Sequence, residues 1–199
     1  MVFAHLFVAP LSSTNHTLVV RLQSLRTAAI SEFDLRGPFQ STIYGRIMDS
    51  TTKVLDAFHS MNLVIQKDPN VTPGETALLK YTSDERAALC ARISHLFQVL
   101  ASSLKLEYPL NNALPDTSNP RDRLLAKIFQ YRKSVGGGKS NNGDEDDGVG
   151  KMVVATDEDY ELLYAYTLVT GQIAAEIKKI EREIEVLFGV VDEDLFELE

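Results

Sequence analysis

Residues 136–140 combine the residue types that a phosphate-binding loop uses. The segment reads Gly136-Gly137-Gly138-Lys139-Ser140. A phosphate loop needs a further glycine five positions before Gly138, and Lys133 stands there instead. It also needs a strand before the loop and a helix after it, and the flanking residues favour neither. The sequence therefore predicts a linker here and no nucleotide site.

A run of four carboxylates at residues 144–147 resembles part of a calcium site. A calcium loop of the EF-hand type alternates its ligands and has glycine at its sixth position. If Gly148 took that position, Gly143 would stand where the first carboxylate ligand is needed. The acidic run therefore favours a solvated linker over a metal site.

The other residues that could do chemistry are scattered. The four histidines, none paired at metal-ligand spacing, are His5, His16, His59 and His95. His59 and His95 lie beside apolar stripes and are expected to hydrogen bond at helix interfaces, and Cys90 is expected to be a small buried side chain. No Gly-x-Ser-x-Gly, His-Glu-x-x-His or Cys-x-x-Cys motif occurs. The sequence thus predicts no catalytic residue, no metal, no cofactor and no enzymatic activity.

One segment of the chain is clearly basic. Its cations are Arg121, Arg123, Lys127, Arg132 and Lys133, and its only acid is Asp122. These side chains could contact anionic lipid headgroups or an acidic partner. They could also clasp the acidic run at 144–147, or form salt bridges to neighbouring acidic helices. All three hypotheses stay open, and the five cations are the candidate contact residues.

The elements that must position these residues are helices, and the clearest one lies near the C-terminus. Its apolar residues recur three and four positions apart at Leu163, Tyr166, Thr170, Ile173, Ile177, Ile180, Ile184 and Leu187. On a helix this spacing forms one seam, and the charged residues around it form a solvated face. Such a seam packs in a core or in an oligomer, and the core is the favoured use because other helices also have apolar faces.

Helical spacing also predicts long helices over about 17–33, 42–66, 82–104 and 121–133, with a short helix at 73–81. The first is expected to pack through a stripe at Leu18, Leu22, Leu25 and Ala29. The segment 121–133 is expected to point Leu124, Leu125, Ile128 and Phe129 inward. Thr82 and Glu85 have the spacing of a capping box. Gly45, inside a helix, indicates a close contact with another helix.

The predicted fold is an all-α bundle of four to five long helices, with no convincing strand. Residues 1–17 are an N-terminal segment without clear assignment, and 18–133 form the first part of the bundle. Residues 134–151 are rich in glycine, asparagine and acids, and predict a disordered linker. Residues 152–189 form the long C-terminal helix that completes the bundle, and 190–199 an acidic tail.

Composition excludes several classes of function. The chain has 199 residues and a net charge of −8, which disfavours nucleic-acid binding because that depends on a basic surface. A single cysteine cannot form an internal disulfide. No run of about 18 apolar residues occurs, so no membrane-spanning helix is expected.

Several short motifs, taken in order, resemble a known family. They are Leu22–Arg26 with Leu35–Pro38, Asp56–Asn62 with Ile65–Pro69, Ser94–Phe97, Leu106–Leu110, Arg121–Ile128 and Asp157–Gly189. Together they resemble the C-terminal domain of the fungal brefeldin A sensitivity proteins, which are related to the aromatic acid exporter and fusaric acid resistance families. The resemblance covers about residues 18–195.

In that family the domain follows transmembrane helices, is expected in the cytosol and has no assigned activity. The resemblance therefore implies a non-catalytic domain on the cytoplasmic side of an exporter-like membrane protein, with an assembly or regulatory role. The transmembrane part is not in this chain, so the implied partners are that part of a related full-length protein and an anionic membrane surface. The alternative is a free-standing soluble helical interaction protein, homodimeric through its last helix.

Overall fold

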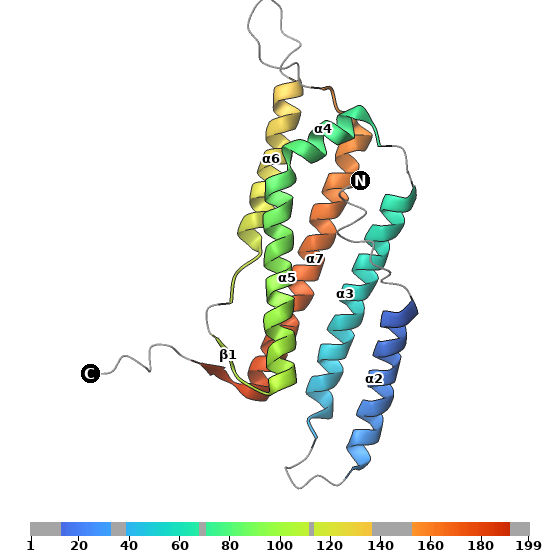
Figure 1. The fold of residues 1–199 in the computed structure, drawn as a ribbon, viewed down its shortest axis with the longest axis vertical. Helices are drawn as coiled ribbons and strands as arrows, with labels where there is room; N and C mark the ends of the chain where they lie inside the picture. Colours follow the sequence, from blue (N-terminus) through green and yellow to red (C-terminus); the bar gives the residue numbers. More distant parts are fainter. Residues whose placement is uncertain (1–12, 33–38, 68–70, 112–113, 137–152, 192–199) are drawn as a thin grey trace, which may run out of the picture.

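The computed structural model describes residues 13–32, 39–67, 71–111, 114–136 and 153–191, and these residues are mostly helical (Figure 1). In chain order the elements are α2 Ser13–Ser31, α3 Ser41–Lys67, α4 Pro73–Tyr81, α5 Ser83–Leu106, β1 Leu110–Asn111, α6 Ser118–Gly136, α7 Asp157–Phe188 and β2 Val190–Val191. Within these ranges α4 is a short helix and the other five helices are long. The predicted all-α fold is confirmed.

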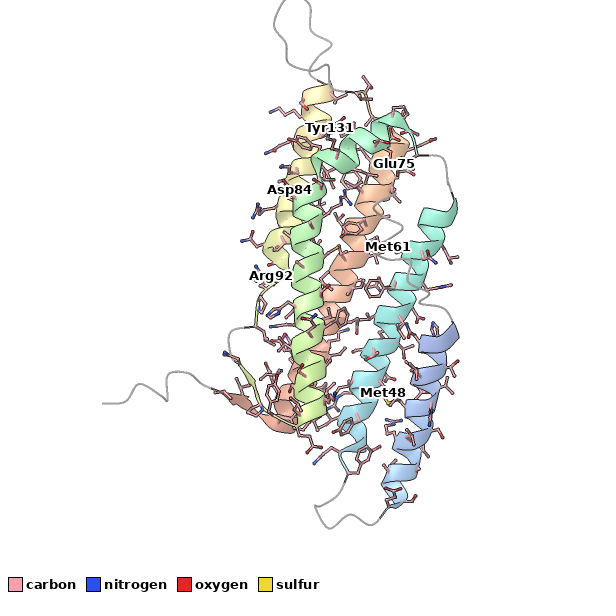
Figure 2. All side chains as sticks on the ribbon, in the orientation of Figure 1. Met48, Met61, Glu75, Asp84, Arg92 and Tyr131 are labelled. Atoms are coloured by element: carbon pink, nitrogen blue, oxygen red, sulfur yellow. The ribbon has the colours of Figure 1, made fainter. Side chains whose placement is uncertain are left out.

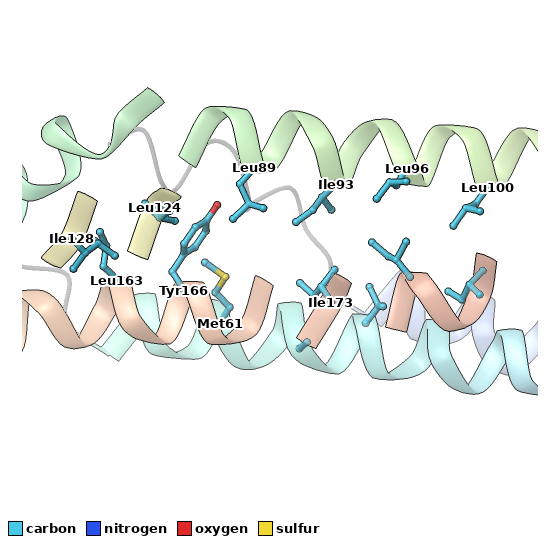
Figure 3. Packing of buried hydrophobic residues seen from close by; sticks show 14 of the residues in the cluster. Met61, Leu89, Ile93, Leu96, Leu100, Leu124, Ile128, Leu163, Tyr166 and Ile173 are labelled. Carbon is cyan, nitrogen blue, oxygen red and sulfur yellow. The ribbon is translucent and has the colours of Figure 1, made fainter. Parts of the chain in front are cut away.

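The last helix, α7, lies at the centre of the described bundle, where α3, α5 and α6 pack against it. The predicted seam is buried there. Seven of its residues are at most 6% exposed: Leu163, Tyr166, Thr170, Ile173, Ile177, Ile180 and Ile184. Figure 3 shows Tyr166 and Ile173 among apolar side chains of the neighbouring helices. The seam therefore forms the core of the chain itself.

Two acids on α7 depart from the prediction of a solvated charged face. Glu176 and Glu181 are buried, at 6% and 5% exposed. Each carboxylate pairs with a lysine three residues away, Lys179 at 2.6 Å and Lys178 at 2.8 Å. These charge partners on the same helix make the burial of the two acids tolerable.

The helix α7 lies within the predicted range 152–189, and both of its ends are capped. The backbone N–H of Thr156 donates to Oδ2 of Asp159 at 2.7 Å and closes a capping box. Gly189 ends the helix with φ 85°, a left-handed conformation that favours glycine. Asp159 also accepts a hydrogen bond from Oγ1 of Thr72 at 2.6 Å. The start of α7 is therefore tied to the start of α4.

The helix α3 runs antiparallel to α7 (Figure 1). Its inner face is buried, with Ile47, Val54 and Met61 at most 7% exposed. Arg46 donates from two nitrogens to the two carboxylate oxygens of Glu183 on α7, each at 2.7 Å. A bidentate pair of this kind holds one relative placement of two helices. The arginine therefore fixes the register of α3 against α7.

The junction between α4 and α5 differs from the prediction. Thr82 does not cap α5, because its Oγ1 donates to the carbonyl of Leu78 in the preceding helix at 2.9 Å. Glu85 turns away from the helix end toward Lys127 on α6, at 3.4 Å. The predicted capping box is wrong because both of its side chains have partners elsewhere.

The helix α5 buries Leu89, Ile93, Leu96 and Leu100 against the rest of the bundle (Figure 3). Among the described helices it is also the one that is long and apolar enough to cross a membrane, with a mean hydropathy of 1.3 over its best window. The sequence predicts no membrane-spanning helix, and α5 qualifies as a candidate by length and composition alone. Core helices of soluble proteins pass the same test, so α5 supplies weak evidence for a span.

A short parallel pairing joins the segment after α5 to the segment after α7. Leu110 pairs with Val190, and Asn111 pairs with Val191. α5 ends before this pairing because Glu107 takes a left-handed conformation with φ 53°. The sequence predicts no strand here, since two residues are too few to show an alternating pattern.

Some predicted boundaries shift. Residues 134–136 belong to α6, so the basic helix extends into the predicted linker. α2 begins at Ser13, inside the segment 1–17 that the sequence left unassigned. Linker residues 137–151, with the acidic run and most of the phosphate-loop-like segment, lie outside the described residues, as do tail residues 192–199.

Candidate interaction surfaces

The basic helix α6 is positioned from its first turn. The carboxylate of Asp116 accepts hydrogen bonds from the backbone N–H of Ser118, at 3.1 Å, and from the Ser118 hydroxyl. These bonds hold the pKa of Asp116 below its usual range. On the inner face, Leu124 and Ile128 are fully buried, as predicted, and Tyr131 is 2% exposed. Because this face packs in the core, the basic side chains of α6 lie on its other faces, toward solvent or toward neighbouring helices.

Two of the candidate cations meet one buried carboxylate on α5. Lys127 Nζ lies 3.4 Å from Oε1 of Glu85, and Arg123 Nη2 lies 4.0 Å from the same oxygen. The Glu85 side chain is only 8% exposed, whereas the Arg123 side chain is 69% exposed. Lys127 also lies 4.9 Å from the centre of the Tyr81 ring, in a cation–π contact. Lys127 therefore stabilises the fold through these contacts, whereas most of the Arg123 side chain is exposed to solvent.

The remaining three cations also differ in how closely neighbouring residues hold them. Arg132 pairs with Asp157 at the start of α7 at 2.9 Å, and both side chains are more than half exposed. Arg121 pairs with its neighbour Asp122 at 3.3 Å, and its side chain lies against Gly171 of α7. Lys133 is exposed and has no ion pair among the residues that the structure describes.

Three of the five cations thus form salt bridges to other helices. Arg123 and Lys127 pair with a carboxylate on α5, and Arg132 pairs with one on α7. This was one of the three hypotheses for the basic segment. The clasp with the acidic run 144–147 falls outside the described residues. Contact with lipid or with an acidic partner stays a prediction.

The position of Phe129 on α6 differs from the prediction. The sequence predicts this side chain inward, but it is 65% exposed. At 100° per residue, the buried residues Leu124, Ile128 and Tyr131 define an inner face, and Phe129 lies well outside it. A phenylalanine therefore stands in solvent in the middle of the basic helix.

A second surface is formed by α2, whose main contact is α3. Val19, at 8% exposed, is the one buried side chain described on this helix. Leu18, Leu22 and Leu25, here called the leucine stripe, are 51%, 52% and 55% exposed. The sequence predicts that this stripe packs in the bundle, and that is wrong because α3 contacts the neighbouring face of α2.

The orientation of α2 is explained by Arg26 and Gly45. Arg26 Nη1 donates to the carbonyl of Ser41 at 3.2 Å. The same nitrogen occupies the space beside Gly45, where a Cβ would lie 2.0 Å from it. The close contact predicted at Gly45 is therefore confirmed, and it holds the Arg26 side of α2 against α3.

The described interior places one thiol beside one phenol. Cys90 and the hydroxyl of Tyr166 share a hydrogen bond of 3.1 Å. Burial raises the pKa of the Cys90 thiol, and burial also raises the pKa of the Tyr166 phenol. Both groups therefore stay protonated near neutral pH. This favours a structural thiol, half-buried rather than buried as predicted.

The three described histidines, His16, His59 and His95, lie on the outside of the bundle. His59 and His95 are exposed, so their predicted role at helix interfaces is wrong. Both stand on the solvent flank of their helical stripes. Among the described residues no group of three or more histidine, cysteine or acidic side chains could hold a metal ion. His5 lies outside those residues.

A comparison with known families gives one match. The family model described as the Brefeldin A-sensitivity protein 4-like domain matches residues 5–183, which include α2 to α6 and most of α7. No curated protein matches the chain, and no solved structure does.

Proposed function

Since this chain belongs to the family of Brefeldin A-sensitivity protein 4-like domains, we propose that it is a non-catalytic docking domain of an exporter-like membrane protein. In this proposal the domain lies on the cytoplasmic side of the membrane and has an assembly or regulatory role. Its partner is the transmembrane part of a related full-length protein. The link to the exporter families and the membrane context are part of the proposal.

The observation that carries the proposal is the exposed leucine stripe of α2. A helix with apolar residues on several sides is usually covered on those sides. On α2, Val20 and Ile30 are also more than 60% exposed, in addition to the stripe. Covering the exposed half of each stripe leucine would contribute about 1 kcal/mol, or about 3 kcal/mol for the three. A contribution of this size adds to a contact between two proteins that lie at the same membrane.

The chemistry of α2 fits an apolar partner. Residues 13–31 contain no acid, and their only cations are Arg21 and Arg26. Arg26 is already engaged with α3. The partner that α2 favours is therefore an apolar helix or bundle surface.

The alternative, a free-standing protein that dimerises through its last helix, has less support. Ile173, Ile177 and Ile184 are at most 1% exposed and pack within the chain. A dimer through this seam would have to displace α3 or α5 and expose their own apolar stripes. The seam accordingly supports a role in the core.

The proposal is tested by replacing the leucine stripe in the natural gene. The variant Leu18→Ser, Leu22→Ser, Leu25→Ser keeps charge and chain length, and Leu168→Ser on α7, a 75% exposed leucine, is the control. Flotation of cell membranes measures docking, and growth in brefeldin A measures function. At about 0.5 M salt, which screens electrostatic binding to lipid, we expect the wild type and the control to float with membranes, and the stripe variant to stay behind and to change brefeldin A sensitivity. A wild-type chain that never floats would overturn the proposal.

A further inference from the structure

The outward face of α6 combines an exposed aromatic ring with cations on both sides. Ala126, Phe129 and Lys133 follow one another at three and four residues and share one stripe. At 100° per residue, Arg121 and Arg132 lie along one side of this stripe. Arg123 and Lys127 lie along the other side. Asp122, four residues before Ala126, continues the stripe, and its side chain is 64% exposed. The face therefore has an exposed ring, one acid and one lysine along its middle and basic residues at its edges.

The structure divides the five cations of α6 into two groups. Lys127 is held by Glu85 and the Tyr81 ring, and Arg121 lies against Gly171. Arg123, Arg132 and Lys133 keep most of their side chains in solvent: Arg123 is 69% exposed, Arg132 is 52% exposed, and Lys133 is exposed. Arg123 and Lys133 are the most available to an external partner. Arg132 is less available, because its guanidinium also lies 5.4 Å from the centre of the buried Tyr160 ring in a cation–π contact.

We propose that this face of α6 docks on an anionic membrane surface, with Phe129 inserted among the headgroups and Arg123, Arg132 and Lys133 bound to lipid phosphate and carboxylate groups. We call Arg123, Phe129, Arg132 and Lys133 the lipid face. An interfacial helix that binds anionic lipid has this composition, with an apolar side chain and Lys or Arg beside it. The proposal goes beyond the docking of α2, because it names a second partner and a different helix.

Charge complementarity selects the membrane as the partner of this face. The helix has five basic residues against one acid, a net charge of +4 in a chain of net charge −8. The acidic remainder of the chain is repelled by an anionic surface, so the field of the membrane orients α6 toward it. The attraction acts within about 8–10 Å of the surface at physiological salt, which requires the lipid face to be outermost.

The ion pairs of the lipid face do not prevent this contact. Arg123 lies 4.0 Å from its carboxylate, which is a long pair, and Glu85 keeps Lys127 at 3.4 Å when Arg123 leaves. Arg132 pairs with Asp157, whose side chain is 86% exposed. Exposed pairs of this kind are weak. A lipid phosphate can therefore replace either carboxylate.

The first experiment measures binding of the purified chain to phosphatidylcholine vesicles with and without about 30% phosphatidylserine, by cosedimentation at about 0.1 M salt. Each basic residue near an anionic surface contributes about a fivefold increase in partitioning. The variant Arg123→Gln, Arg132→Gln, Lys133→Gln should therefore lose about 100-fold. Its matched control is Lys53→Gln, Lys105→Gln, Arg182→Gln, which has the same net charge and removes exposed cations elsewhere.

The second experiment tests insertion of the ring. The chain contains no tryptophan, so Phe129→Trp places a single fluorescent reporter on the lipid face. We expect its emission to shift to shorter wavelength with phosphatidylserine vesicles and to be quenched by brominated lipids. Leu168→Trp, on an exposed position of α7, should show neither change.

Three results would overturn the proposal. The first would be that the wild type does not bind the phosphatidylserine vesicles. The second would be that the matched charge control loses as much affinity as the lipid-face variant. The third would be that the tryptophan at 129 stays in water while the chain is bound. The last result would point to an acidic protein as the partner of the cations. These vesicles contain no protein, so the leucine-stripe variant should bind them normally, and failure of one proposal is distinguishable from failure of the other.

Discussion

The helices α2 and α7 contain apolar residues at the same heptad spacing, yet these residues are buried on α7 and exposed on α2. On α7, Ile173, Ile177 and Ile184 are at most 1% exposed. On α2, Leu18 and Leu25 are more than half exposed. The spacing of a stripe therefore specifies a surface that can pack against a helix. Whether a neighbour covers that surface depends on the topology of the bundle.

The two helices differ in how many neighbours they have. α7 is packed by α3, α5 and α6, while α2 lies at the edge and packs mainly on α3. Most charged residues of α7 lie outside its seam, so its free side is largely suited to water, although Leu168 and Val186 are exposed there. The free side of α2 is suited to another apolar surface. This contrast makes α2 the part of the domain best suited to an external contact.

The largest effect that separates the two helices is expected for a buried charge in α7. Ile177→Asp would place a carboxylate at a position that is 1% exposed. We expect the free energy of unfolding to fall by about 4 kcal/mol or more, since an unpaired charge must be buried or the core must open. Urea denaturation followed by circular dichroism measures this. A melting curve unchanged from the wild type would contradict the central position of α7.

A smaller effect is expected where α4 meets the start of α7. A Cβ at Gly74 would lie 2.8 Å from Cα of Ala155 and 2.5 Å from Oδ2 of Asp159. We expect Gly74→Ala to lower the free energy of unfolding by about 2 kcal/mol, because backbone atoms must move. At Gly45 the nearest atom is the flexible end of Arg26. Gly45→Ala should therefore stay within about 1 kcal/mol of the wild type, and equal losses would remove the distinction between the two junctions.

Much of the fold follows from local sequence signals. The seam of α7, its start at Thr156 and its end at Gly189 are all visible as spacing and capping residues, and the structure has them there. The predicted capping box of Thr82 and Glu85 does not form because Glu85 pairs with Lys127, which lies on a helix about 40 residues later in the chain. Such long-range partners leave no trace in local spacing. The pairing of β1 with β2 is missed because two residues are too few to show an alternating pattern.

Less of the candidate surfaces follows from sequence. The cluster of cations on α6 is visible as composition, but their division into held and free side chains needs the positions of Glu85, Tyr81 and Asp157. Phe129 is predicted inward because it follows Ile128. A stricter use of helical geometry, with Leu124, Ile128 and Tyr131 as the inner face, places it outside.

A modest pH effect is expected at the edge of the α3–α7 contact. The hydrogen bond from Arg46 holds the pKa of Glu183 below its ordinary value of 4.5. A carboxylate with a lowered pKa in the folded state stabilises the fold above its ordinary pKa, and this contribution is lost as the pH falls through the lowered value. Stability should therefore decrease as the pH falls below about 4.5. Arg46→Met should raise the pKa of Glu183 in an NMR titration, and an unchanged pKa would show that the pair is absent in solution.

The smallest effect on stability is expected for the leucine stripe itself. Leu18→Ser, Leu22→Ser, Leu25→Ser removes apolar atoms that are already half in water, so we expect the free energy of unfolding of the isolated chain to change by no more than about 1 kcal/mol. Urea denaturation at two protein concentrations is the measurement. A loss above about 2 kcal/mol would mean that the stripe is covered in solution. If that loss depends on protein concentration, a second copy covers it, and α2 then resembles α7 in being a packed helix. If stability is unchanged while docking to membranes is lost, the two stripes have separate uses, one for the core and one for a partner.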